Sequence, residues 1–295
     1  MSSGRKVLVT GATGHLGTAV CRALFDAGHE VRATDRRYVA DSLVKPLLGD
    51  LLDEHFVYRA VEGCDAVVHL GNHPNMFAGP SPQQILAENV RMNANVFWAS
   101  AQLGVRDIVF ASSVQVMLRL HGNGHEAPYD LPYLPLDENA PRNPGTNPYA
   151  MSKEVGERVL ETLCAEYPAL CATALRYPML PRDYWANHLR QTKLPSPSRL
   201  NIGECVTHLL LGDAGKLVCQ ALLHRKPGYR QYFPAWSIQF RDVSVEDLRK
   251  LYYSHVPLRS ADKPLREFVD LSALKRELDW EPTERIEVQL DGPLA

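Results

Sequence analysis

The sequence predicts an α/β protein with a doubly wound parallel sheet and a small, discontinuous C-terminal lobe. Apolar segments of strand length alternate with longer amphipathic segments, a pattern typical of parallel strands joined by helices that cover both faces of the sheet. The glycine-rich stretch Gly11-Ala12-Thr13-Gly14-His15-Leu16-Gly17 follows the first apolar segment directly and opens the first amphipathic one. This placement is typical of the first strand-to-helix turn of such a sheet.

The elements follow one another in strand-helix alternation. Strands are expected at residues 6–10, 29–33, 66–70, 107–111, 172–177 and 231–235, because these segments are short and apolar. Helices are expected at residues 14–27, 81–103, 149–166 and 209–223, because apolar residues recur there with helical spacing.

Prolines divide the chain into two parts. The segment 128–148 is rich in proline and is expected to be a loop, and Pro181, Pro195 and Pro197 interrupt a charged stretch that does not fit another strand-helix unit. The sequence therefore predicts a sheet domain from residues 1–178 plus 205–236. The smaller lobe is predicted from residues 179–204 plus 237–295.

Charge and cysteine content restrict the class of protein. The 295 residues carry 32 basic and 34 acidic side chains, so there is no electrostatic reason to expect a nucleic-acid partner or an acidic membrane surface. The six cysteines form no C-x-x-C pair, and no apolar run approaches the roughly 20 residues that a membrane span requires. We expect a soluble, cytoplasmic protein with reduced thiols and no membrane association.

The glycine-rich turn predicts a dinucleotide site. Small residues at Gly11, Gly14 and Gly17 let the backbone approach a pyrophosphate, and the following helix offers its unpaired N–H groups to that anion. Asp35 ends the second expected strand, where a carboxylate can bind the adenosine ribose hydroxyls and repel a 2′-phosphate. NAD is therefore favoured over NADP, although Arg36 or Arg37 could hold that phosphate.

Tyr149 and Lys153 form the candidate catalytic pair. They are four residues apart at the start of an expected helix, so both side chains lie on one face. A tyrosine with a pKa of about 10 is a poor base at neutral pH, and a nearby ammonium group and an oxidised nicotinamide both favour the phenolate. We expect Lys153 to lower the pKa of Tyr149 in this way.

These motifs, in this order, resemble the NAD-dependent epimerase/dehydratase family, the extended short-chain dehydrogenases with a Rossmann sheet. The resemblance includes Gly49-Asp50-Leu51, Val67-Val68-His69-Leu70-Gly71 and Phe110-Ala111-Ser112-Ser113, and it continues to Leu278-Asp279-Trp280-Glu281-Pro282. It implies that Ser113 binds the reacting oxygen, that Lys153 also holds the nicotinamide ribose, and that Pro178 lies against the nicotinamide. The cofactor-binding residues expected on this basis are Gly11, Thr13, Gly14, His15, Leu16, Gly17, Asp35, Arg36, Asp50, Leu51, Leu70, Gly71, Asn89, Ala111, Tyr149, Lys153, Tyr177 and Pro178.

Two departures from the family pattern restrict the chemistry. Dehydratases of the family follow the catalytic Ser/Thr with an Asp-Glu pair, whereas here Ser113 is followed by Val114 and Gln115, which argues against dehydration. The usual V-Y-G is replaced by Val116-Met117-Leu118, so the substrate is not indicated by this loop.

The expected function is that of an NAD-dependent oxidoreductase or epimerase acting on a sugar, with a nucleotide sugar favoured. A net dehydrogenase of a sugar or uronic acid is the alternative, because Pro82-Gln83-Gln84-Ile85-Leu86 is similar to uronate dehydrogenases. A non-catalytic dinucleotide sensor is disfavoured, since it has no chemical need for Ser113, Tyr149 and Lys153. The lobe segment carries basic residues that suit a sugar phosphate or carboxylate, or that simply face solvent: Arg182, Arg190, Lys193 and Arg199.

Two further expectations concern metals and assembly. The pairs His69/His73 and His121/His125 have helix-like spacing but no third ligand nearby, so no metal site is expected. The helix at 81–103 carries apolar residues on more than one face, including Phe97 and Trp98, and the family resemblance implies a homodimer in which this helix and the one at 149–166 pair with their copies.

Overall fold

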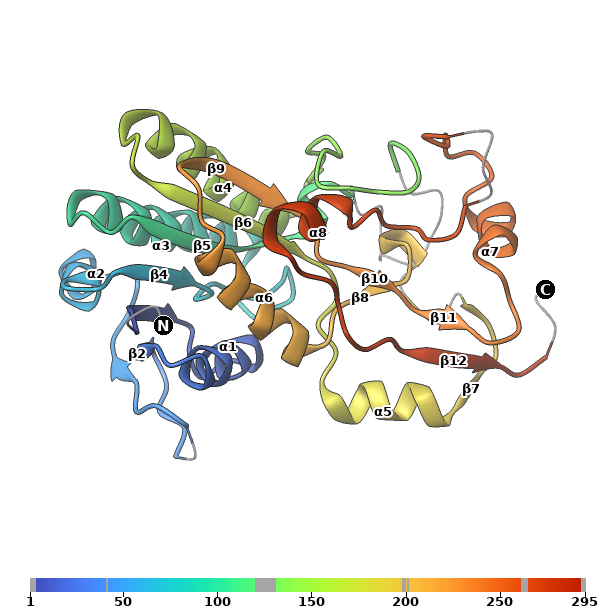
Figure 1. Ribbon diagram of the computed structural model, residues 1–295, viewed down its shortest axis with the longest axis horizontal. Helices are drawn as coiled ribbons and strands as arrows, with labels where there is room; N and C mark the ends of the chain where they lie inside the picture. The colour runs from blue at the N-terminus through green and yellow to red at the C-terminus, as the bar shows by residue number, and fades with distance from the viewer. Residues whose placement is uncertain are drawn as a thin grey trace.

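A parallel seven-stranded sheet forms the larger part of the molecule (Figure 1). The computed structural model describes residues 4–40, 42–119, 131–197, 200, 202–260 and 265–292. The sheet has the order β3-β2-β1-β4-β5-β6-β9, and every neighbouring pair is parallel. Its strands are β1 (Lys6–Thr10), β2 (Glu30–Asp35), β3 (Leu47–Leu48), β4 (Ala66–His69), β5 (Asp107–Ser113), β6 (Cys171–Tyr177) and β9 (Gly228–Tyr232).

Helices cover both faces of this sheet, so the predicted fold class is confirmed. On one face, α1 (His15–Asp26), α6 (Leu211–Leu223) and α8 (Ser272–Leu278) share an apolar core with the strands. On the other face, α2 (Glu54–Val61), α3 (Pro82–Gln102) and α4 (Pro148–Glu166) form a second core. The strand order reverses between β1 and β4, and ligands of such sheets bind at this switch point, outside the carboxyl ends of the strands.

The remaining elements form a lobe at one end of the sheet, on the right of Figure 1. It contains α5 (Asp183–Gln191), α7 (Val245–Tyr252) and a short parallel sheet of β7 (Lys193–Leu194), β12 (Glu287–Leu290) and β11 (Gln239–Phe240). The antiparallel strands β8 (Thr207–His208) and β10 (Trp236–Ser237) form a further pair. Two short 3-10 turns complete the described elements: η1 (Val114–Val116) follows β5, and η3 (Ile202–Glu204) precedes β8. Side chains from residues 114–118 and 131–140 also pack into the apolar core of this lobe.

The long elements agree with the sequence predictions to within two residues at most ends. The last strand is different: β9 covers Gly228–Tyr232 rather than 231–235, because its pairing with β6 begins at Gly228 opposite Cys171. All six cysteines are free thiols. No helix in the described part of the chain is both long enough and apolar enough to cross a bilayer.

A buried ion pair connects α4 to β6. Arg176 Nε and Nη2 donate to the two carboxylate oxygens of Glu157 at 2.9 and 2.8 Å, and both side chains are almost fully buried. Ser112 Oγ on β5 donates to the same carboxylate at 2.6 Å. Arg176 Nη1 also donates to the carbonyl oxygens of Glu138 and Ala140, so the pair ties the loop before α4 to the sheet.

Glu157→Gln should destabilise the fold, because it leaves the Arg176 charge buried without its partner. The expected loss is about 3–5 kcal/mol of unfolding free energy, measured by urea denaturation at pH 7. Glu30→Gln, which breaks the surface pair of Glu30 with Lys6, is the matched control and should cost less than about 1 kcal/mol. Equal effects of the two substitutions would contradict a structural role for the buried pair.

The stability difference between the wild type and Glu157→Gln should also depend on pH. Burial acts to raise the pKa of Glu157, but hydrogen bonds and charge from Arg176 outweigh it and lower the pKa below its ordinary value of 4.5. The stabilisation is therefore complete above pH 4.5 and is lost as the pH falls toward the lower pKa of the folded state. The stability difference between wild type and Glu157→Gln should shrink in that acid range.

Candidate active site

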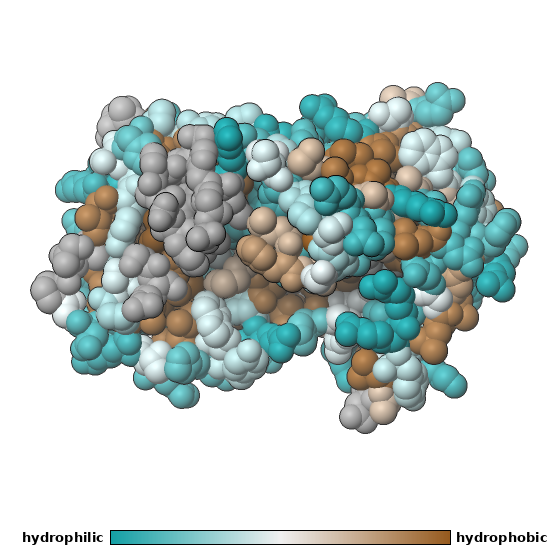
Figure 2. Space-filling view, turned by 180° about the vertical axis from the view of Figure 1, so that it is seen from behind, coloured by the Kyte–Doolittle hydropathy of each residue, from teal (hydrophilic) through white to brown (hydrophobic). Residues whose placement is uncertain are grey.

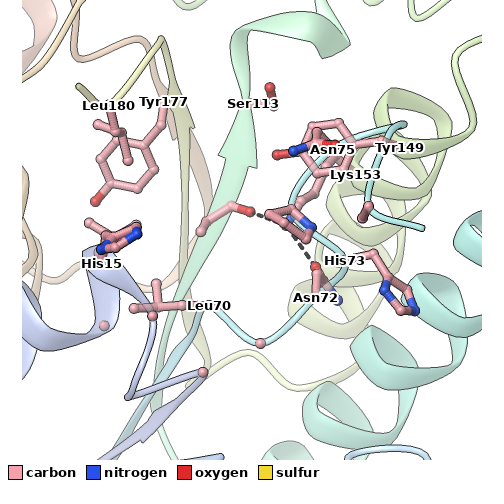
Figure 3. A pocket seen from close by; sticks show the side chains of 18 of the residues that line it. His15, Leu70, Asn72, His73, Asn75, Ser113, Tyr149, Lys153, Tyr177 and Leu180 are labelled. Carbon is pink, nitrogen blue, oxygen red and sulfur yellow. Dashed lines mark hydrogen bonds between the residues drawn. The ribbon is translucent and has the colours of Figure 1, made fainter. Parts of the chain in front are cut away.

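A cavity of about 1010 Å³ opens at the carboxyl ends of the strands, at the switch point of the sheet. Its walls include the glycine-rich turn, the ends of β2, β4, β5 and β6, the start of α4 and part of the lobe. Figure 3 shows Ser113, Tyr149, Lys153 and Asn72 on one side of the cavity, with Tyr177 and His15 on the other. The two groups leave a channel between them.

The glycine-rich turn packs too tightly for side chains. Gly11 has a φ of +66°, and a Cβ there would lie 2.9 Å from the backbone of Gly71. A Cβ on Gly17 would lie 2.2 Å from the carbonyl oxygen of Gly11. Gly14 is the N-cap of α1 and gives no side-chain cap, so the N-terminus of this helix is open toward the cavity. A helix N-terminus of this kind favours an anion such as a pyrophosphate.

Asp35 stands beside this turn at the end of β2. Its carboxylate accepts hydrogen bonds from the backbone N–H groups of Thr13 (3.1 Å) and Arg37 (3.2 Å). Arg36 and Arg37 line the same end of the cavity. The buried Oγ1 of Thr13 has no hydrogen-bond partner among the described residues. The open helix end, the glycine cradle and this unpaired hydroxyl all fit a dinucleotide.

Tyr149, Lys153 and Ser113 meet on the opposite wall. Asn147 caps α4 by accepting from the backbone N–H groups of Tyr149 and Ala150, so the helix starts with Tyr149 facing the cavity. Lys153, one turn later, places its Nζ 5.5 Å from the centre of the Tyr149 ring. Ser113 ends β5 and makes a hydrogen bond that acts to lower the pKa of Tyr149.

Burial controls the proton affinities of this pair. It raises the pKa of Tyr149 to about 12, against the effect of Ser113 and with a further rise from the charge of Glu204. It lowers the pKa of Lys153 to about 7. Burial of the phenol is the largest of these effects, so the pKa of Tyr149 lies above its ordinary value of 10; the expected lowering of this pKa by Lys153 stays a prediction.

Asn72 is a site residue that the sequence analysis missed. Lys153 Nζ donates to Asn72 Oδ1 at 2.6 Å and to the carbonyl oxygen of Ala111 at 2.7 Å (Figure 3). These two bonds hold the ammonium group between β5 and the loop after β4. Asn72 Nδ2 is buried without a hydrogen-bond partner in the described ranges.

A chain of hydrogen bonds joins the loop after β4 to the start of α4. Thr10 Oγ1 accepts from the backbone N–H groups of Leu70 and Gly71, both at 3.1 Å, so its own hydrogen is donated to His69 Nδ1 at 2.7 Å. His69 Nε2 then carries the ring proton and donates to Asn93 Oδ1 at 2.9 Å. Asn93 Nδ2 donates to the carbonyl oxygen of Ser152 on α4. Burial lowers the pKa of His69 to about 3, which keeps the ring neutral.

Most of the expected site residues line this single cavity. The exceptions are Thr13, which binds Asp35, and Asn89, whose buried amide instead holds His73 and Ser152. The expected residues on the cavity wall are Gly11, Gly14, His15, Leu16, Gly17, Asp35, Arg36, Asp50, Leu51, Leu70, Gly71, Ala111, Ser113, Tyr149, Lys153, Tyr177 and Pro178.

The basic lobe residues and the histidines named in the sequence analysis do not gather at one site. Of the basic residues expected in the lobe, Arg182 lines the cavity, whereas Arg190 binds Glu284 and the carbonyl oxygen of Arg285. His73 pairs with Glu88. Arg199, His121 and His125 lie outside the described residues. Within the described ranges, no three His, Cys, Asp or Glu side chains are grouped as metal ligands.

Comparison with known proteins identifies the family. The NAD dependent epimerase/dehydratase family matches residues 7–183, which include the glycine turn, Ser113, Tyr149 and Lys153. The chain belongs to this family. Its members are NAD-dependent, in agreement with the cavity.

Individual relatives cover several chemistries. The 2-alkyl-3-oxoalkanoate reductase of Stenotrophomonas maltophilia is 33% identical over 183 residues, which are 61% of this chain and 51% of the relative. The uronate dehydrogenase of Pseudomonas syringae pv. tomato is 29% identical over 155 residues, 52% of this chain and 51% of the relative. The chain thus spans about half the length of these two relatives.

A solved structure shows the same fold over nearly the whole chain. The UDP-glucose 4-epimerase of Bifidobacterium longum, in complex with NAD+ and UDP, has a TM-score of 0.65 and 20% identity, covering 95% of this chain and 94% of that one. The likeness extends to the lobe as well as to the sheet.

Proposed function

We propose that this protein is an NAD-dependent oxidoreductase or epimerase that acts on a sugar, with a nucleotide sugar favoured. The observation that carries this proposal is the convergence of Ser113, Tyr149 and Lys153 on one wall of the cavity that the glycine turn closes. Uronate dehydrogenase and UDP-glucose 4-epimerase among the relatives support a sugar substrate.

The chain's own residues have distinct parts in the reaction. NAD, when bound, supplies a hydride acceptor for the substrate carbon. Ser113 Oγ binds the reacting oxygen, and Tyr149 Oη takes the hydroxyl proton. Because the pKa of Tyr149 is about 12, the phenolate needs the positive charge of Lys153 beside it. Asn72 and Ala111 keep that charge in place, and lobe residues such as Arg182 and Glu204 line the substrate end of the cavity.

A net dehydrogenase of a sugar or uronic acid is the second candidate. It uses the same residues and differs only in releasing the reduced dinucleotide after one transfer. Incubation with nucleotide sugars and uronic acids separates the two, because a dehydrogenase accumulates NADH whereas an epimerase isomerises the sugar without net reduction. The absence of both reactions with every sugar would contradict the proposed function.

Tyr149→Phe should abolish turnover while leaving the dinucleotide bound. The substitution removes only the hydroxyl that transfers the proton, and we expect a loss of about 10²–10⁴-fold in kcat. The Kd for NAD, measured by calorimetry, should change less than about threefold, a difference of under ~0.7 kcal/mol. Turnover like that of the wild type would rule out Tyr149 as the acid-base residue.

Asp35→Asn should shift the cofactor preference toward NADP. The amide keeps a hydrogen-bond acceptor for Thr13 N but loses the charge that repels a 2′-phosphate, and Arg36 and Arg37 are close by. We expect the ratio of Kd values for NADPH and NADH, measured by fluorescence, to fall at least about tenfold, or ~1.4 kcal/mol. Asp26→Asn on the exposed side of α1 is the control. A wild-type protein that already prefers NADPH would contradict this assignment.

We also propose a homodimer formed through α3 and α4. Hydrophobic side chains reach the surface in the half of the molecule that holds these helices (Figure 2). Trp98, Leu103 and Val155 are 40%, 42% and 37% exposed there. Phe97 was expected on this surface, but it is not part of it. Its side chain is fully buried against His69 and Phe110.

Trp98→Glu should therefore convert a dimer to a monomer of 33.0 kDa, measured by light scattering at micromolar concentration. Leu223→Glu is the matched control, since Leu223 is exposed at the end of α6, away from α3. A wild-type mass of one chain, or equal effects of both substitutions, would contradict the proposed interface.

A further inference from the structure

Glu204 is a buried carboxyl group at the lobe end of the cavity. It ends the short turn η3, is 3% exposed, and lines the same cavity as Ser113 and Tyr149. Its charge acts on Tyr149, raising the pKa of the phenol. No sequence motif indicates a role for Glu204, because it is far along the chain from every motif and only the lobe brings it to the cavity.

Two amides with fixed orientations hold this carboxyl group. Asn147 Oδ1 is used by the backbone N–H groups of Tyr149 and Ala150, so Asn147 Nδ2 donates to Gln115 Oε1 at 2.9 Å. Gln115 Nε2 in turn donates to Glu204 Oε1 at 3.0 Å. A donor facing this oxygen favours a carboxylate there. The cap of α4 is thus connected to the lobe through Gln115.

The backbone after Glu204 is also constrained. Cys205 and Val206 have φ values of 54° and 48°, in the left-handed region that a β-branched residue rarely adopts. Both side chains are buried in the lobe core, which keeps the turn in this conformation. Such strain persists only where the surrounding structure determines it. The packing of the lobe therefore holds the backbone next to Glu204 in a strained conformation, and this fixes the position of Glu204.

We propose that Glu204 is a specificity-determining residue that accepts a hydrogen bond from a substrate hydroxyl or ammonium group and excludes a substrate carboxylate from this end of the cavity. The inference rests on the proposed function and narrows it to neutral or amino sugars over uronic acids. A carboxylate is an acceptor only, so it gives Glu204 no hydrogen bond and adds like charge in a site with little water. Anionic parts of a substrate would instead meet Arg182, which lines the cavity but is exposed.

The test compares sugars that differ only at one carbon. UDP-glucose and UDP-glucuronate, and free glucose and glucuronate, are assayed with NAD for isomerisation and for NADH formation. We expect the wild type to favour the neutral member of a pair by at least about tenfold in kcat/KM, or ~1.4 kcal/mol. Glu204→Gln, which keeps an acceptor for Gln115, should reduce this ratio by about tenfold. Glu166→Gln, at the exposed end of α4, should leave it unchanged.

Other outcomes separate the two proposals. Equal turnover of both members, or a uronate preference, would overturn the role of Glu204 and leave the proposed function intact. If no sugar is turned over, the proposed function fails, and calorimetry of the NAD-loaded protein with glucosamine, glucose and glucuronate decides the role of Glu204. Binding that is strongest for glucosamine and weakest for glucuronate would support the proposed role of Glu204. Any other order of affinities, or no binding, would overturn that role. Glu204→Ser replaces the glutamine variant if that variant does not fold.

Discussion

The buried pair of Arg176 and Glu157 fixes the geometry on which the site depends. Glu157 lies one turn after Lys153 and two turns after Tyr149 on α4, so the same helical face that presents this candidate catalytic pair to the cavity is anchored to β6 further along. Two charges taken out of water must be well matched, and here Ser112, Arg142 and Gln231 complete the hydrogen bonding. The rotation of α4 about its own axis is thereby set by an ion pair rather than by apolar packing alone.

A second set of polar contacts sets the position of α4 near its start. Thr10, His69 and Asn93 connect the loop after β4, which lines the cavity, to the backbone of Ser152. Each member has one tautomer or amide orientation that satisfies its neighbours, so the chain is fully determined. The loop after β4 and the start of α4 consequently share one rigid frame, which the proposed proton transfer at Tyr149 requires.

Much of this structure could be predicted from short motifs, whose own residues lie close together in the sequence. The glycine turn, Asp35 at a strand end and the spacing of Tyr149 and Lys153 depend on local backbone geometry, and all of these residues line or adjoin one cavity. Asn72 and Glu204 were missed, because their roles arise from contacts across 81 and 89 positions of the chain. For the lobe, the sequence predicted residue ranges but no individual strands. Its strands are two to four residues long, which is too short to show a periodicity. Burial, the largest cause of the raised pKa of Tyr149, is a property of the assembled site and does not follow from the spacing of Tyr149 and Lys153.

The lowered pKa of Lys153 affects how many protons are taken up or released when a ligand binds. With its pKa lowered to about 7 by burial, the lysine holds fewer protons near neutral pH than it does in the unfolded chain, so its burial opposes folding most below pH 7 and progressively less between pH 7 and 10.5. A ligand that brings negative charge near Nζ raises this pKa again. Binding of such a ligand near neutral pH therefore takes up protons from the buffer, and its apparent affinity weakens as the solution becomes more alkaline.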